Sequence, residues 1–211
     1  ITVSGGALCF LDETTDERIE VSDIRLNASL KSSPETGFES QGRLSLGKTL
    51  LAAEGYPDVV APETTVAWSA LYNHRSGALN IRHIGIASDG LDISCVGAVG
   101  DLVGDEPNFA VSATVAAQLS RFGWAMPRAD LRDAAGELSA TAEAKGNAAD
   151  FQVELAAALD GAMFASASNA AAAFEIRSAS LTQSLRVKDG KPVAGVGGLT
   201  LRNVRAVGKG K

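Results

Sequence analysis

The sequence predicts a mainly β fold: a long, curled antiparallel sheet, built as a meander of repeated bent strands, with at most short helices. Apolar and polar residues alternate with period two along most of the 211 residues, which is the pattern of half-buried strands. Short polar turns separate the alternating runs, which favours hairpins over parallel βαβ units. A third observation, a step of three inside several strands, predicts that these strands bend.

Four runs show the alternation most clearly. They are "FESQGRLSL" from Phe38, "TVAWSALY" from Thr65, "LDISCVGAV" from Leu91 and "FAVSATVAAQL" from Phe109. Turn-forming residues lie between them and at both ends, at 12–17, 32–37, 74–77, 88–90, 104–108 and 188–192.

Three segments have a less regular pattern. The alanine-rich stretch 137–176 has a high helix propensity, but its apolar residues alternate from Leu138 onward, so we expect strands. "LSRFGWAMP" at 119–127 predicts a short helical turn before Pro127, and "GYPDVVAPE" at 55–63, with two prolines, predicts a loop.

The step of three occurs in five segments, each with apolar or small residues at offsets zero, two, five and seven. These segments are "ITVSGGAL" from Ile1, "IEVSDIRL" from Ile19, "LNIRHIGI" from Leu79, "FEIRSASL" from Phe174 and "LTLRNVRA" from Leu199. A bulge or a strand break at the step would keep the apolar side chains on one face while bending the sheet. Chance recurrence of apolar pairs in a β-rich chain is the alternative. If the bends repeat in one sense, the sheet forms a groove or an incomplete barrel or sandwich.

Composition and charge exclude several function classes. The net charge of -6 and the pI near 5.0 argue against nucleic-acid binding, because phosphate binding needs clustered Lys and Arg.

His74 is expected in an exposed turn and His83 at a bulge or on the sheet surface. The sequence has no GxSxG, HExxH or P-loop motif, so we expect no enzyme, cofactor or metal site. The acidic runs "DETTDE" and "GDEPN" are interpreted as solvated hairpin tips.

The two cysteines, Cys9 and Cys95, lie in apolar, strand-like surroundings. We expect two buried thiols, and the alternative is a disulfide between them in an oxidising compartment.

Two long segments resemble the AsmA-like family. The first is "ITVSGGALCFLDETTDERIEVSDIRLNASL", where a strand, the turn Gly5-Gly6 and the apolar Leu8-Cys9-Phe10 lead to Asp12, a polar turn and "VSDIRLNASL". The second begins "GALNIRHIGIASDGLDISCVGAV" and ends at "RFGWAMP". The resemblance covers residues 1–127 and contains no catalytic residues, so it implies a fold and not an activity.

The resemblance implies a membrane-anchored envelope protein of Gram-negative-type bacteria, with curled antiparallel strands on the periplasmic side of the inner membrane. The related TamB-like and chorein-type proteins carry phospholipid along a hydrophobic groove between membranes. The chain begins at Ile1 without an apolar leader and is short for such a bridge. We therefore expect a fragment of a larger protein, with the anchor outside this chain.

The functional hypothesis is a non-enzymatic module, with an apolar groove for phospholipid handling, transport or outer-membrane biogenesis. Phospholipid or acyl chains and other envelope proteins are the expected partners. The candidate groove residues, which would equally suit an ordinary core, are Trp68, Leu79, Ile81, Leu91, Ile93, Phe109 and Val111. The alternative is a structural or adhesive β-module with a closed core and no lipid. Residues 1–211 are expected to form one elongated domain, with sub-repeats 1–127 and 128–211 as an open division.

Overall fold

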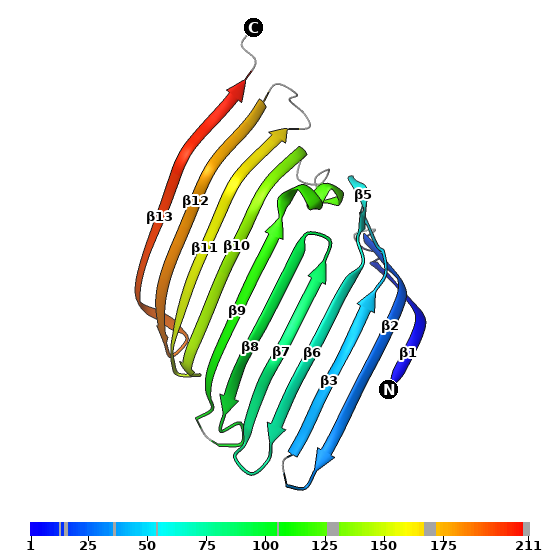
Figure 1. Cartoon of the computed structure of the whole chain (residues 1–211), viewed down its shortest axis with the longest axis vertical. Coiled ribbons are helices and arrows are strands. Elements are labelled where there is room, and N and C mark those ends of the chain that lie inside the picture. The colour runs from blue at the N-terminus through cyan, green and yellow to red at the C-terminus, as the bar shows by residue number, and fades with distance from the viewer. Residues whose placement is uncertain are drawn as a thin grey trace.

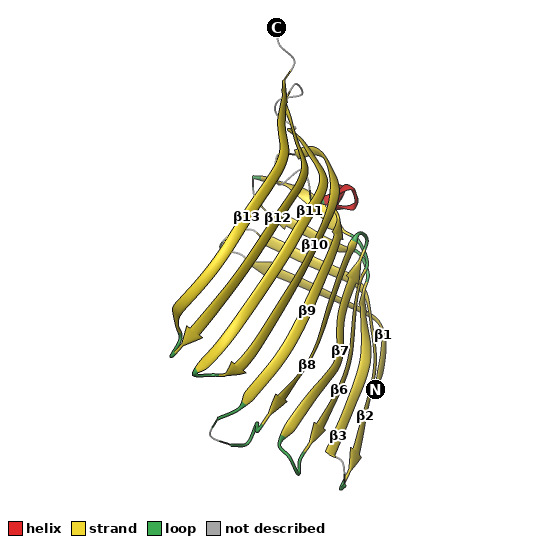
Figure 2. Ribbon diagram, turned by 60° about the vertical axis from the view of Figure 1, so that its left-hand side comes forward, coloured by secondary structure: helices red, strands yellow, loops and turns green. Residues whose placement is uncertain are grey.

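The computed structural model confirms the predicted architecture, a curled antiparallel sheet of thirteen strands that does not close into a barrel (Figures 1 and 2). It describes residues 1–12, 14, 17–35, 37–53, 55–104, 106–125, 131–166 and 172–208. The strands and the single short helix are β1 (Thr2–Asp12), β2 (Glu17–Ser33), β3 (Gly37–Leu46), β4 (Thr49–Ala53), β5 (Tyr56–Ala61), β6 (Thr64–Asn73), β7 (Ala78–Ser88), β8 (Leu91–Gly100), β9 (Asn108–Gln118), η1 (Leu119–Trp124), β10 (Leu131–Asn147), β11 (Asp150–Ser166), β12 (Ala172–Lys188) and β13 (Lys191–Gly208).

The strands follow one another as a meander with one insertion. The order across the sheet is β13-β12-β11-β10-β9-β8-β7-β6-β3-β2-β4-β5, and β1 lies on the other side of β2. Only the β4–β5 hairpin interrupts the sequence order, because β3 pairs directly with β6. The hydrogen-bonded sheet is continuous from β9 to β10. Whether 1–127 and 128–211 are sub-repeats stays an interpretation, and residues 127 and 128 themselves lie outside the described residues.

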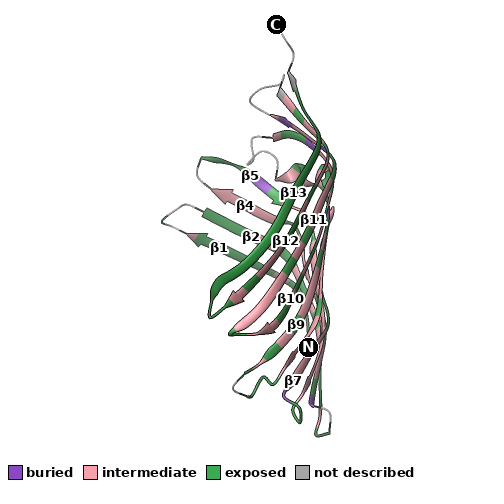
Figure 3. Ribbon diagram, turned by 90° about the vertical axis from the view of Figure 1, so that its left-hand side faces the viewer, coloured by how far each residue is buried: buried purple, intermediate pink, exposed green. Residues whose placement is uncertain are grey.

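Strand β2 bends and changes its partner halfway along its length. Residues 18–21 pair with β4, whereas residues 25–33 pair with β3. Between them Asp23 adopts a left-handed conformation with φ of 52°. The strands β4 and β5, together with residues 8–12 of β1 and 17–21 of β2, form a small leaf that projects from the main sheet (Figure 3).

The same kind of irregularity occurs in the other segments that have the step of three. In β1 the pairing shifts between Val3 and Gly6, and in β7 it shifts between Ile81 and Ile84. In β13, Asn203 has a φ of 51°. These shifts and left-handed residues confirm the predicted breaks in β1, β2, β7 and β13.

The remaining segment with the step of three lies in β12. Its pairing with β11 shows no register shift, because β11 contains a step of the same size. Ala179 pairs with Leu159 and Ile176 pairs with Ala162, so three residues are traversed on both strands. In β11 the step contains Gly161, with φ of 59°. The matched steps let neighbouring strands bend together, and Figure 1 shows β11, β12 and β13 turning at similar heights.

Two further predictions are confirmed and two are wrong. Strands β10, β11 and β12 occupy the alanine-rich stretch apart from the turn at 148–149 and residues 167–171, which lie outside the described residues. The helix η1 is the predicted helical turn, although Pro127 also lies outside the described residues. The predicted loop at 55–63 is wrong, because β5 occupies most of it. This strand pairs only with β4, and Pro57 is tolerated because an edge strand needs fewer backbone donors. The expected burial of both thiols is also wrong: Cys9 is exposed and Cys95 is half-buried, because no second layer covers the sheet, and both cysteines are free.

The sheet is a single layer with a very small interior. Among the described residues, the buried apolar side chains are Val59, Ala117, Ala134, Ala162 and Ala165. Most other residues are half-buried or exposed, as the colouring of Figure 3 shows. A packed domain of this length would bury many large side chains, so one side of the sheet is open to whatever surrounds it.

Candidate apolar groove

The seven predicted groove residues lie on one face of the sheet. Residues that pair directly in an antiparallel ladder point to the same side. Leu79 pairs with Val99, which pairs with Phe109, and Ile81 is linked in the same way through Gly97 to Val111. Two strand pairings therefore place these four predicted residues in two short rows.

Trp68, Leu91 and Ile93 belong to the same face. Trp68 pairs with Ile84, which follows Ile81 after the step of three, and Ile93 pairs with Ile86 two residues further along β7. Leu91 lies two residues from Ile93. All seven side chains are half-buried. This exposure is expected where the sheet covers a side chain from one side and the opposite side is open.

This apolar face is the concave face of the sheet. In the small leaf Val59 pairs with Leu51, which pairs with Ile19, so Val59 shares the apolar face. Val59 is 2% exposed although β5 is an edge strand. The cover comes from across the curl, because β5 contacts η1, which also packs on β10 (Figure 1). The leaf and η1 therefore meet over one end of this concave face, which we call the apolar groove.

The step of three keeps the apolar groove continuous through the bends. Val21 pairs with Leu8 before the bend in β2, and Ile24 pairs with Gly6 after it. Without the extra residue, every side chain beyond the bend would move to the opposite face. The repeated step thus combines curvature with a single apolar lining.

Many large apolar side chains on this face remain exposed. The exposed members on the concave side are Val3, Leu8, Phe10, Ile19, Leu30, Phe38, Ile84, Phe174, Leu199, Leu201 and Val204. Their exposed fractions run from 37% at Ile84 to 70% at Leu30. Scattered apolar residues are normal on a protein surface, but a contiguous apolar face of this extent marks an interaction surface.

A tryptophan lies at the wall of the apolar groove. The Trp68 indole Nε1–H donates a hydrogen bond to the Ser40 hydroxyl, 3.1 Å away on the neighbouring strand. A side chain at Gly42, the direct partner of Trp68, would overlap the indole ring. The glycine therefore lets the ring lie over β3 with its polar edge satisfied.

Sequence reasoning missed the C-terminal half of the apolar groove. The missed concave residues include Val153, Leu155, Leu159, Leu181 and Leu185, which continue the face through β11 and β12. Their alternation identified the strands, and the same signal could have extended the predicted groove into them. Val59 was missed because its segment was predicted to be a loop.

The convex face carries the polar and charged groups. Its depressions are shallow, and one of about 470 Å³ has Asp92, Glu137 and Asp160 on its rim. No group of His, Cys, Asp and Glu within the described ranges is placed to hold a metal ion. His74 lies exposed in the β6–β7 turn, and His83 lies exposed beside the bulge of β7, over Gly85. The histidines therefore lie outside the apolar groove.

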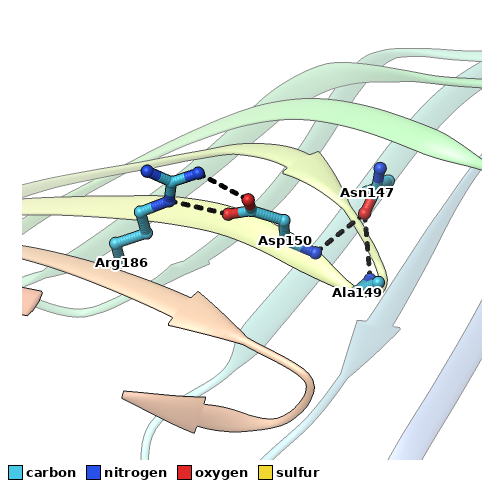
Figure 4. Close-up of polar contacts among 4 residues, drawn as sticks. All are labelled: Asn147, Ala149, Asp150 and Arg186. Atoms are coloured by element: carbon cyan, nitrogen blue, oxygen red, sulfur yellow. Dashed lines mark hydrogen bonds and ion pairs between the residues drawn. The ribbon is translucent and has the colours of Figure 1, made fainter. Parts of the chain in front are cut away.

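The hairpin turns opposite η1 are fixed by side-chain hydrogen bonds (Figure 4). Asn147 Oδ1 accepts hydrogen bonds from the backbone N–H groups of Ala149 at 3.0 Å and Asp150 at 2.8 Å. The Arg186 guanidinium donates two hydrogen bonds to the Asp150 carboxylate, at 2.9 Å and 2.6 Å. These bonds, with smaller contributions from the charges of Arg186 and Lys188, hold the pKa of the Asp150 carboxyl below its usual value.

Comparison with protein-family models, curated proteins and solved structures gave no match. None of the helical residues that the structure describes forms an apolar helix long enough to cross a membrane.

Proposed function

We propose that this chain is a non-enzymatic, lipid-handling module whose apolar groove shelters acyl chains. The observation that carries the proposal is the continuous apolar lining of a concave, single-layer sheet, with large side chains such as Phe10 and Leu30 more than half exposed. Leaving apolar area in water costs roughly 25 cal/mol per Å². A ligand with hydrocarbon chains is the occupant that removes this cost without requiring directional hydrogen bonds.

The shape of the groove supports an extended ligand. The lining runs across many strands, and it contains few polar groups that could fix a compact, hydrogen-bonded molecule. Flexible acyl chains can follow adjoining apolar rows, and such rows are formed here by Leu79, Ile81, Val99, Phe109 and Val111. The ligand class proposed is therefore phospholipid or free fatty acid.

The resemblance of residues 1–127 to AsmA-like proteins supports the further proposal that this module belongs to a cell envelope. On this proposal the chain contributes one section of a groove on the periplasmic side of the inner membrane, in an assembly with a membrane anchor and other envelope proteins. Phospholipid transport and outer-membrane biogenesis are the proposed processes.

Lipid extraction tests the proposal directly. The protein is expressed in a bacterial host, purified without detergent and examined by native mass spectrometry, and its organic extract is analysed for phospholipid. We expect bound phospholipid and saturable binding of a fluorescent fatty acid. Protein that carries no phospholipid and does not bind the probe saturably would contradict the proposed function.

A further inference from the structure

Aromatic side chains line the concave face where it meets the hairpin turns. Phe38 pairs directly with Tyr72, and Phe109 is linked to Phe151 through Gly146. The rings of Phe38 and Tyr72 stack with their centroids 6.5 Å apart, and the centroids of Phe109 and Phe151 are 5.8 Å apart. Strand pairing joins these residues into one row, which we call the aromatic rim: Phe38, Tyr72, Leu79, Val99, Phe109 and Phe151. It is the last concave row before the turns that join β2 to β3, β6 to β7, β8 to β9 and β10 to β11 (Figure 1).

The floor of the groove, from the aromatic rim to the row of Leu91, carries no charge in β3 and β6–β12. The strand pairings identify the concave positions, and none of those positions in these strands is Asp, Glu, Lys, Arg or His. The serine and threonine hydroxyls of the floor form hydrogen bonds within the protein, since Ser40 accepts from Trp68 and Thr64 donates to Ser88 at 3.2 Å. A charged headgroup therefore finds no opposite charge on this floor and must lie at one end of it.

The end covered by the leaf and η1 offers little to a headgroup. The buried apolar side chains of the described residues all lie on the leaf or in the η1 half of the sheet, and no polar or charged residue in the described ranges is buried with them. One buried side-chain polar atom of the described residues lacks a hydrogen-bond partner, the indole Nε1 of Trp124 in η1. A single donor cannot replace the water that hydrates a phosphate. Arg121, the cation of η1, is exposed and lies 3.8 Å from Asp89, which already provides its opposite charge.

The aromatic rim, in contrast, borders polar turns that are open to water. The exposed residues in and beside these turns include the cations Arg75, Lys188 and Lys191 and the carboxylates of Asp101 and Asp189. Both signs of charge are therefore present at this end, which suits a zwitterionic headgroup.

We propose that the groove binds a zwitterionic phospholipid with its headgroup at the aromatic rim and its acyl chains directed toward the leaf and η1. The inference rests on the proposed function and adds a direction to it. Rings with one apolar and one wet side are favoured where hydrocarbon meets water, and Tyr72 and the 47% exposed Phe38 have this position. Neighbouring strands lie about 4.8 Å apart, so the strands from β3 to β12 have room for the two chains of a phospholipid side by side.

Quenching by brominated lipid tests the direction of the ligand. Three proteins with one tryptophan each report from different depths: Phe38→Trp at the aromatic rim, the native Trp68 on the floor and the native Trp124 in η1. Every other tryptophan is replaced by phenylalanine. Each protein is loaded from vesicles of phosphatidylcholine that is brominated either near the glycerol or near the chain ends, and is then re-isolated by size exclusion. A phosphate assay measures the lipid that each protein retains.

The ratio of quenching by the glycerol-side label to quenching by the chain-end label is the quantity compared. We expect this ratio to exceed one for the Phe38→Trp reporter, to fall below one for Trp124 and to be intermediate for Trp68. Phe109→Trp is a second reporter at the rim, for use if circular dichroism shows that Phe38→Trp disturbs the sheet. The control Val96→Trp, on the convex face, should be quenched by neither label.

The possible failures separate this inference from the proposed function. Loaded protein with the opposite order of ratios, or with equal ratios at both ends of the groove, would overturn the direction alone. Strong quenching of the Val96→Trp reporter would place the lipid outside the groove and would overturn both. Protein that retains no phospholipid would contradict the proposed function itself, and this inference with it.

Discussion

The Ser22 hydroxyl donates a hydrogen bond to the backbone carbonyl of Lys48, 3.2 Å away, and the Ser22 N–H donates to the same oxygen at 3.3 Å. The Gly47 N–H donates in return to the Ser22 carbonyl at 2.9 Å. These bonds join the bend in β2 to the break between β3 and β4. The bend in β2 and the break between β3 and β4 therefore lie side by side. Together they form the hinge of the small leaf, which covers one end of the groove.

Gly47 is required by the close approach of Ser22. A Cβ on Gly47 would lie 2.5 Å from the Ser22 carbonyl oxygen and 3.0 Å from the Asp23 Cβ. We expect Gly47→Ala to lower the free energy of unfolding by about 1–3 kcal/mol, because the backbone must move apart and the bonds of the bend weaken. Chemical denaturation measures this change. The matched control is Gly123→Ala in η1, where no atom lies within 4 Å of the added Cβ, and a similar loss there would contradict the explanation.

The left-handed conformation of Asp23 predicts an order among substitutions. Aspartate and asparagine tolerate a φ of 52°, whereas a β-branched side chain clashes with its own backbone there. We expect Asp23→Asn to be nearly neutral and Asp23→Val to cost about 1–2 kcal/mol in the free energy of unfolding. The exposed ion pair with Arg25 contributes little to this difference. Thermal or urea unfolding of the two variants should give unequal stabilities, and equal values would argue against a strained bend.

The Asp150–Arg186 pair predicts a pH dependence. The hydrogen bonds from Arg186 lower the pKa of Asp150 in the folded protein. The stabilisation is therefore complete above the unfolded-state pKa of aspartate and is lost as the pH falls through the lower, folded-state value. Asp150→Asn should be less stable than the unmodified protein at neutral pH, and this difference should shrink in acid.

The control for this pH dependence is the partner of Asp150. In an Arg186→Gln background, the Asp150→Asn substitution should have a smaller and less pH-dependent effect on unfolding, because the hydrogen bonds are already absent. A pH dependence that persists in this background would show that another group is responsible.

Trp68 predicts a spectroscopic signal for a ligand in the groove. In a Trp124→Phe background Trp68 is the remaining tryptophan, since the sequence contains two. We expect a brominated fatty acid to quench its fluorescence in a saturable manner. The unlabelled fatty acid should restore the signal by competition. Quenching that rises linearly without saturation would indicate collisions in solution and no bound ligand.

The sheet was predictable because its two determinants are local. Period-two alternation identifies strands, and the step of three at Ile19 and Leu79 marks where they bend. The β5 strand was not predictable, since Pro57 within it is tolerated only because the strand lies at an edge, and Pro62 follows its last residue. The direction of the curl and the contact between β5 and η1 are tertiary properties. They depend on strands far apart in the sequence, so the candidate groove residues could be assigned to one face, but the closure of one end by β5 and η1 could not be predicted.

The binding of a fluorescent fatty acid to two variants of β8 tests the central claim most directly. Ile93 lies in the groove, and Val96 lies on the convex face of the same strand, 45% exposed. Our account predicts that Ile93→Lys weakens binding at least tenfold, which corresponds to roughly 1.4 kcal/mol, while Val96→Lys leaves it unchanged. Equal binding by both variants, with the sheet intact by circular dichroism, would contradict the claim that the concave apolar face holds acyl chains.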